Sequence, residues 1–154
     1  MPKIYLAADH AGFALKEVVK GALQDSHEVI DCTETFTEGD DYPDLITPCV
    51  ENVAGDAGSL GVVIGASGQG EAMTANRVRG VRAAVYYGSA GKQIDADGSE
   101  LSMLASVRAH NHANVLSLGA RFLSEEEAIA AVHEFIAAPV SDDARHIRRI
   151  EKLG

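Results

Sequence analysis

The chain contains 154 residues, of which 46% are hydrophobic and 23% charged, and its formal net charge at pH 7 is −10. This length and composition indicate one globular domain over residues 1–154 with a core of its own. The negative charge disfavours general binding to nucleic acid or to anionic membranes, and no apolar run approaches membrane-spanning length, so we expect a cytoplasmic protein.

Short apolar runs alternate with helical patterns along the chain. This alternation predicts an α/β three-layer sandwich around a parallel sheet, in which ligands bind beyond the carboxyl ends of the strands. The polar, glycine-bearing residues 88–99 are assigned to a surface loop. Strands are predicted over residues 4–8, 27–32, 61–64, 83–86 and 115–118, and helices over 12–23, 43–54, 71–78, 100–108, 124–138 and from the cap at 141–143 to about 153.

The most informative stretch is the glycine-rich turn that follows the third strand, Gly65-Ala66-Ser67-Gly68-Gln69-Gly70-Glu71. The spacing from Gly65 to Gly70 matches the first half of a P-loop, but Glu71 and Ala72 stand where a P-loop has Lys and Ser or Thr. A carboxylate beside free backbone N–H groups suits proton abstraction next to a carbonyl, because those groups stabilise the enolate oxygen. Glu71 is therefore the predicted base.

Asp9 and His10 follow the first strand and should meet this turn, and the residues after the fourth strand, at one edge of the sheet. Asp9 there would handle hydroxyl protons, and His10 would meet an anion. The alternative is that Asp9 only caps the next helix and His10 faces solvent.

His110 lies in a polar segment between a helix and the fifth strand. His112 is two residues away without a nearby carboxylate, and this spacing disfavours a metal site, as does the spacing of the two cysteines. We favour general acid–base work by His110, since neutral imidazole acts near pH 7. Simple loop solvation is the alternative.

Basic residues are concentrated near the C-terminus, where Arg145 and Arg149 share a helix face. Guanidinium groups bind phosphate through paired donors, and Arg121 after the fifth strand is a further candidate. The alternative is a solvated face paired with nearby carboxylates. A helix at the far end of the chain need not reach the active edge of its own subunit. In that case its arginines would complete the site of a neighbouring subunit.

The assembled motifs resemble the type B ribose-5-phosphate isomerases, a family that also includes allose- and galactose-6-phosphate isomerases. They occur in order over nearly the whole chain, which is more specific than any one of them. The matching motifs are Ala8-Asp9-His10-Ala11-Gly12, Asp41-Tyr42-Pro43, the turn from Gly65 to Glu71, Ala75-Asn76, His110-Asn111, Gly119-Ala120-Arg121 and Arg145-His146-Ile147-Arg148-Arg149.

The resemblance implies a Rossmann-like sandwich with a five-stranded parallel sheet, in a homodimer or dimer of dimers with shared active sites. One subgroup of the family has a catalytic Cys before the glycine turn and the other a Glu after it; Gly65 and Glu71 imply the second subgroup. The family's chemistry implies a phosphorylated sugar as substrate, no metal and no organic cofactor.

The resemblance also assigns a role to each remaining site residue. His110 would open the sugar ring, Asp9 would assist proton movement among the hydroxyls, and Asn111 would orient a sugar hydroxyl. Ser67 and the turn amides, with Gly68 and Gly70 among the substrate-binding groups, would stabilise the enediolate. The phosphate would be held by His10, Arg121, Arg145 and Arg149.

The predicted reaction is the interconversion of ribose 5-phosphate and ribulose 5-phosphate through an enediolate. One departure concerns substrate preference: residues 88–99 are longer than the corresponding family segment. A hexose 6-phosphate substrate, either allose or galactose 6-phosphate, is therefore an alternative. A nucleotide- or flavin-binding module at the same edge and a catalytically inactive homologue are the others.

Overall fold

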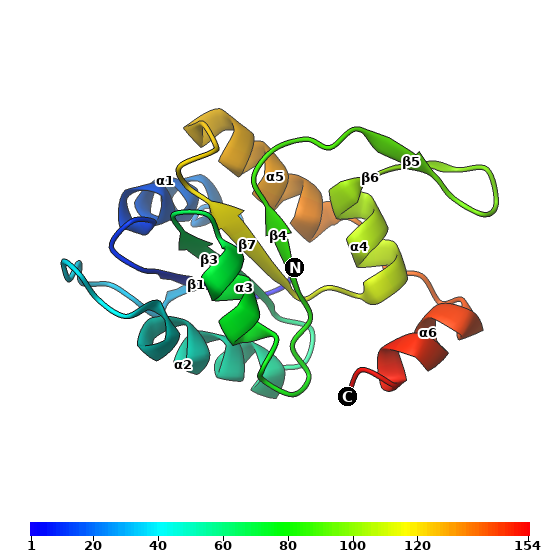
Figure 1. The fold of residues 1–154 in the computed structure, drawn as a ribbon, viewed down its shortest axis with the longest axis horizontal. Helices are drawn as coiled ribbons and strands as arrows, with labels where there is room; N and C mark the ends of the chain where they lie inside the picture. The colour runs from blue at the N-terminus through cyan, green and yellow to red at the C-terminus, as the bar shows by residue number, and fades with distance from the viewer.

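The computed structural model describes all residues from 1 to 154 and contains a five-stranded parallel sheet at its centre. Across the sheet the order is β2-β1-β3-β7-β4, and every neighbouring pair is parallel (Figure 1). This confirms the predicted fold class and sheet. The strands are β1 (Ile4–Ala8), β2 (Val29–Asp31), β3 (Leu60–Gly65), β4 (Ala83–Tyr86) and β7 (Val115–Gly119).

Helices cover both faces of the sheet, as right-handed crossovers between parallel strands require. On one face α1 packs beside α5, with α4 next to α5, and α2 and α3 cover the other face (Figure 1). The bounds of the helices are α1 (Phe13–Leu23), α2 (Tyr42–Gly55), α3 (Gln69–Ala75), α4 (Met103–Asn111), α5 (Glu125–Ala137) and α6 (Ala144–Glu151).

The two faces of the sheet bury separate cores, because successive strand residues point to opposite sides. In β1, Leu6 belongs to the core beneath α1 and α5, and its neighbour Ala7 belongs to the core beneath α2 and α3. The central strand β3 is fully buried along its length. This double burial explains why its sequence is a continuous apolar run.

The segment after β4 differs from the prediction. An antiparallel hairpin, β5 (Lys92–Ile94) and β6 (Glu100–Ser102), replaces the expected loop, and α4 begins at Met103 instead of residue 100. Gly98 adopts a positive φ of 87° in the hairpin turn. Ser102 starts α4, because its hydroxyl accepts a hydrogen bond from the Ala105 N–H at 3.0 Å.

Helix α3 also differs from the prediction of 71–78, since it begins at Gln69 and ends at Ala75. Gly68 precedes it with a left-handed φ of 76°, which starts the helix two residues early. Beyond its end, the Asn76 side chain donates to the carbonyl of Ala83 at 3.1 Å and accepts from its N–H at 2.8 Å. These bonds tie the chain after α3 to the beginning of β4.

Candidate functional site

The switch point of the sheet lies between β1 and β3. The chain leaves β1 for β2 on one side and returns to β3 on the other, so the loops after β1 and β3 border a common crevice. Asp9 follows β1, and the turn from Gly65 to Glu71 follows β3. The predicted base and its predicted helper therefore meet at the position where α/β folds bind ligands.

The Glu71 side chain is buried, with 3% of the residue exposed. Burial raises the pKa of its carboxyl group to about 7, and the negative charge of Asp9 acts in the same direction. The carboxylate lies directly over the Cα atom of Gly65, so a Cβ atom at position 65 would overlap it. A base with a pKa near 7 can both accept and return a proton at neutral pH.

Asp9 is also buried, and its position serves two purposes. Its Oδ1 atom accepts hydrogen bonds from the N–H groups of Ala11 at 2.9 Å and Gly12 at 3.0 Å. A Cβ atom at Gly12 would overlap the carbonyl oxygen of Ile64, so only glycine lets this turn approach the end of β3 so closely. Asp9 therefore holds the turn that precedes α1 and lies beside Glu71, but it does not cap the helix, because the N-cap of α1 is Gly12 and no side chain caps it.

Hydrogen bonds from β7 and from the residues after it fix the glycine turn in place. The Ser117 hydroxyl donates to the Gly68 carbonyl at 2.6 Å, and the Arg121 N–H donates to the Ala66 carbonyl at 2.9 Å. The Ser67 hydroxyl accepts from the Gln69 N–H at 3.3 Å, while no backbone acceptor takes the N–H groups of Ser67 and Gly68. Those N–H groups remain available to an anionic oxygen.

His10 and Arg121 lie close to each other on the exposed side of this edge. The hydrogen bond between His10 Nδ1 and Asp40 Oδ1, at 2.9 Å, raises the pKa of His10, and the positive charge of Arg121 acts in the opposite direction. At the other end of the turn, the ring of Tyr42 packs on Gly70. We call Asp9, His10, Ser67, Gly68, Gly70, Glu71 and Arg121 the sheet-edge group.

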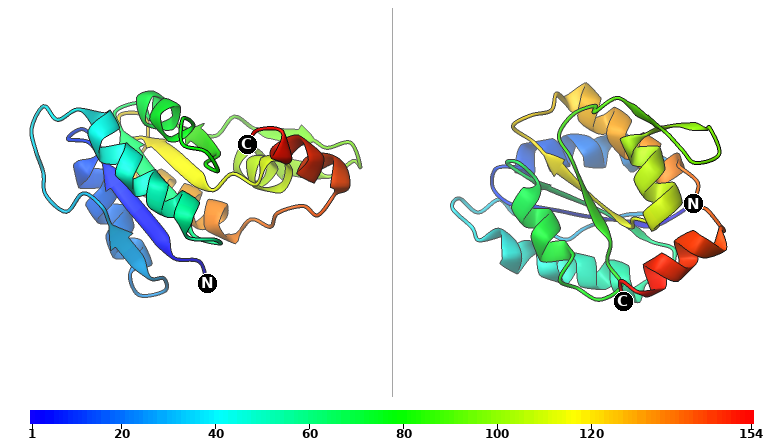
Figure 2. Two further views of the ribbon diagram at one scale, coloured as in Figure 1. Left: turned by 90° about the horizontal axis from the view of Figure 1, so that it is seen from below. Right: turned by 45° about the vertical axis from the view of Figure 1, so that its right-hand side comes forward.

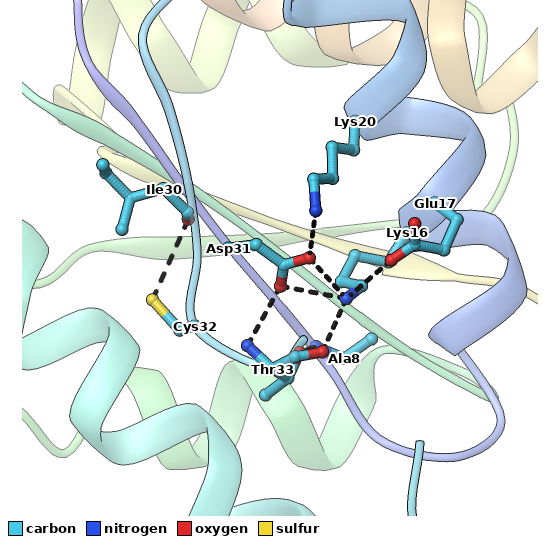
Figure 3. A network of polar contacts seen from close by, with 8 residues as sticks. All are labelled: Ala8, Lys16, Glu17, Lys20, Ile30, Asp31, Cys32 and Thr33. Atoms are coloured by element: carbon cyan, nitrogen blue, oxygen red, sulfur yellow. Dashed lines mark hydrogen bonds and ion pairs between the residues drawn. The ribbon is translucent and has the colours of Figure 1, made fainter. Parts of the chain in front are cut away.

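A buried lysine supports the backbone that leads into Asp9 (Figure 3). Lys16 is fully buried, and its Nζ atom donates to Asp31 at 2.7 Å and to the carbonyl of Thr33 at 2.6 Å. The Thr33 hydroxyl in turn accepts from the N–H of Ala8 at 2.9 Å. Because a buried charge is costly without partners, this network fixes the loop after β2 against the end of β1.

The other predicted residues line a separate cavity of about 450 Å³, which we call the α4–α6 cavity. His110 and Asn111 come from the end of α4, and Arg145 and Arg149 from α6. Arg145 pairs with Asp143 at 3.1 Å, as the solvated-face alternative expected, yet both arginines also line the cavity. The hairpin closes one wall with Gln93, Ile94, Asp95 and Ala96.

The α4–α6 cavity and the sheet-edge group do not form one site within a single chain. Asn111 ends α4 just before β7, at the amino end of the sheet, whereas the glycine turn follows the carboxyl end of β3. Val115 is in register with Gly61 and Gly119 with Gly65, so four residue steps, roughly 13 Å at about 3.3 Å per residue, separate the two edges. Figure 2 shows α4, α6 and the hairpin together on one side of the sandwich.

Sequence reasoning missed several partners of the site residues. Asp40 binds His10, Asp95 binds His110, and Ser117 holds the glycine turn. Asp40 directly precedes a recognised motif, whereas nothing in the sequence marked Asp95 or Ser117. His146 lies within the C-terminal motif, and its ring lies tilted against that of His110 with the centroids 4.7 Å apart. No three His, Cys, Asp or Glu side chains gather in a group that could hold a metal ion. None of the helices is both long and apolar enough to cross a membrane.

The fold and the sheet-edge group together define an α/β protein with acid–base groups at the switch point of its sheet. Residues 4–153 match the family described as Ribose/Galactose Isomerase, and the chain belongs to this family.

Relatives with this architecture match the chain over almost its whole length. It is 37% identical over 153 residues to ribose-5-phosphate isomerase B of Mycobacterium tuberculosis, covering 98% of this chain and 87% of that protein. The crystal structure of ribose-5-phosphate isomerase B from Mycoplasma genitalium with bound ribulose-5-phosphate is 33% identical, with a TM-score of 0.82, and covers 98% of this chain and 93% of that one. The enzyme from Anaplasma phagocytophilum is 30% identical, with a TM-score of 0.83 and coverage of 100% and 97%.

Proposed function

We propose that residues 1–154 form a single sugar-phosphate isomerase domain that interconverts ribose 5-phosphate and ribulose 5-phosphate. The observation that carries this proposal is the buried Glu71 carboxyl group, with its pKa raised to about 7, beside Asp9 and the free N–H groups of the glycine turn. Family membership and the names of the relatives supply the substrate.

In the proposed reaction, Glu71 removes the proton from C2 of the open-chain aldose. The electron pair of that C–H bond forms the C1–C2 double bond, and the carbonyl electrons move to O1, giving an enediolate. Ser67 and the amides of the turn stabilise this oxygen, and Asp9 assists the transfer of a proton between O2 and O1. Glu71 then returns its proton to C1, which leaves the ketose with its carbonyl at C2.

The assignment of the base to Glu71 rests on the geometry at Gly65. Position 65 is where one subgroup of the family places a catalytic Cys, and here it has no side chain. The space that such a side chain would fill contains the Glu71 carboxylate. We therefore assign this chain to the subgroup that uses a Glu.

We further propose that two copies of the chain complete each site. Since the α4–α6 cavity and the sheet-edge group lie at opposite edges of the sheet, His110, Asn111, Arg145 and Arg149 would act on a substrate bound by a partner's sheet-edge group. His110 would move the proton that opens the sugar ring, and Asn111 would orient a hydroxyl. Arg145 and Arg149 would bind the phosphate with His10 and Arg121 of the partner subunit.

A coupled assay of the purified protein on ribose 5-phosphate, allose 6-phosphate and galactose 6-phosphate tests this function. We expect turnover of ribose 5-phosphate, persistence of activity after exhaustive chelation, and deuterium from heavy water at C1 of the ketose. Preferential turnover of a hexose 6-phosphate would correct the substrate. No turnover of any of the three, together with tight binding of a nucleotide or a flavin, would replace the proposal by a binding module.

A further inference from the structure

The β5–β6 hairpin lies where the sequence predicted a surface loop, and its turn reaches the imidazole of His110. The Oδ2 atom of Asp95 lies 3.1 Å from Nε2 of His110. Both side chains are about one-fifth exposed, at 19% for Asp95 and 20% for His110. The contact is therefore sheltered within the wall of the α4–α6 cavity.

The hairpin turn holds Asp95 in one orientation. The Asp95 N–H donates to the Ser99 carbonyl at 2.7 Å, and the Gly98 N–H donates to the Asp95 carbonyl at 2.9 Å. The Ala96 N–H donates to Oδ1 of Asp95 at 2.6 Å. With its backbone and one carboxylate oxygen fixed in this way, Asp95 presents the other oxygen to His110.

This contact selects one tautomer of His110. The Ala96 N–H and the contact with His110 hold the pKa of Asp95 below its usual value, so at neutral pH its carboxylate only accepts hydrogen bonds. The Nε2 atom of His110 must then carry a proton. The Nδ1 atom faces the hydroxyl of Ser106 at 3.3 Å, and the ring of His146 covers one side of the imidazole.

We propose that Asp95 is a positioning residue for His110: it fixes the orientation and the Nε2–H tautomer of the imidazole that acts on the sugar ring. This inference rests on the proposed function for the role of His110 in the reaction. Carboxylates that orient a functional histidine are a general device for fixing its tautomer. The hairpin thus contributes to the chemistry as well as to the shape of the cavity.

A double-mutant cycle tests whether Asp95 acts through His110. We expect Asp95→Ala to lower kcat by about ten- to a hundredfold while KM changes little, as for other residues that orient a functional histidine. In a His110→Ala background the same change should have almost no further effect, because its target is missing. Glu100→Ala, which removes an exposed carboxylate from the same hairpin outside the cavity, is the control and should leave kcat unchanged.

Two outcomes would overturn the proposal. Additive losses in the double variant would show that Asp95 acts independently of His110. A rise in kcat/KM in Asp95→Ala would show that the hairpin covers the imidazole and blocks it. Thermal unfolding of each variant separates a loss of folding from a loss of positioning.

Nitrogen-15 NMR of the His110 ring separates a failure of this inference from a failure of the proposed function. We expect a protonated Nε2 in the neutral imidazole of the wild type, and a change in the tautomer ratio in Asp95→Asn, whose amide can also donate. A wild type with its proton on Nδ1 would exclude the pairing, whatever the substrate. With the expected tautomer but no turnover of any sugar phosphate, the pairing would stand, and the positioning role would fall with the proposed function.

Discussion

The sheet-edge group and the α4–α6 cavity place their functional side chains in contrasting environments. Glu71 and Asp9 are 3% and 6% exposed and are surrounded by β-strand ends, whereas Asn111, Arg145 and Arg149 are exposed. A proton acceptor with a raised pKa needs removal from water, which the core of the sandwich provides. Phosphate binding needs charged donors on long side chains, which a peripheral helix can extend toward another molecule.

The largest effect is expected where the sheet-edge group loses Glu71, the proposed base. Glu71→Gln keeps the size of the side chain and removes the proton acceptor, so kcat should fall by about 10²–10⁴-fold while KM changes little. Steady-state kinetics on ribose 5-phosphate measure this. Retention of most of the turnover would show that another group abstracts the proton.

Subunit mixing tests directly whether the two regions cooperate across two copies of the chain. Glu71→Gln and the double variant Arg145→Ala/Arg149→Ala should each be inactive alone. After random exchange in a twofold dimer, about half of the dimers are mixed and each contains one intact site, so about a quarter of wild-type activity should return. No recovery despite demonstrated exchange would place the arginines outside a shared site.

A smaller effect is expected from a single change in the α4–α6 cavity. Arg149→Ala removes one charged donor, a hydrogen bond worth roughly 1.5–3 kcal/mol, so substrate binding should weaken by about ten- to a hundredfold. The fold should persist because Arg149 lies on the exposed surface of α6. Arg148→Ala, one residue away and outside the cavity lining, is the matched control and should bind substrate like the wild type. Equal losses in both variants would indicate a general charge effect.

The smallest effect concerns stability and follows from the pKa of Glu71. Its pKa is raised from 4.5 to about 7, so between these values the folded protein binds more protons than the unfolded chain. The free energy of unfolding therefore decreases as the pH rises through this window. The glutamine in Glu71→Gln cannot ionise. The Tm of this variant minus the Tm of the wild type should therefore be larger at pH 8 than at pH 5, by on the order of a few degrees.

Thermal denaturation at the two pH values measures this difference. The exposed Glu126 provides a control, because Glu126→Gln should change Tm by nearly the same amount at both pH values. An equal advantage of Glu71→Gln at pH 5 and pH 8 would show that Glu71 does not carry the raised pKa.

Local sequence patterns predicted the sheet and the identity of the groups at its edge. The continuous apolar run of β3 and the turn ending in Glu71 follow from chain-local rules, since burial on both faces and a glycine turn leave clear signatures. The hairpin could not be predicted in this way, because its two three-residue strands are exposed or half-exposed and show no alternation of burial. The contacts of Asp40 with His10 and of Asp95 with His110 join residues 30 and 15 positions apart, so no spacing rule reveals them.

The overlap between a side chain at position 65 and the carboxylate of Glu71 restricts the order in which this site could change during evolution. A lineage that acquired a side chain at position 65 first would displace Glu71, the proposed base, before a base at position 65 had a suitable environment. A lineage that lost Glu71 first would pass through a form with no base. Either route crosses an ancestor with impaired turnover, which favours change in a duplicated copy while the original maintains the metabolic flux. A Cys before the turn and a Glu after it, the two bases that the proposed function distinguishes, would then persist as separate lineages.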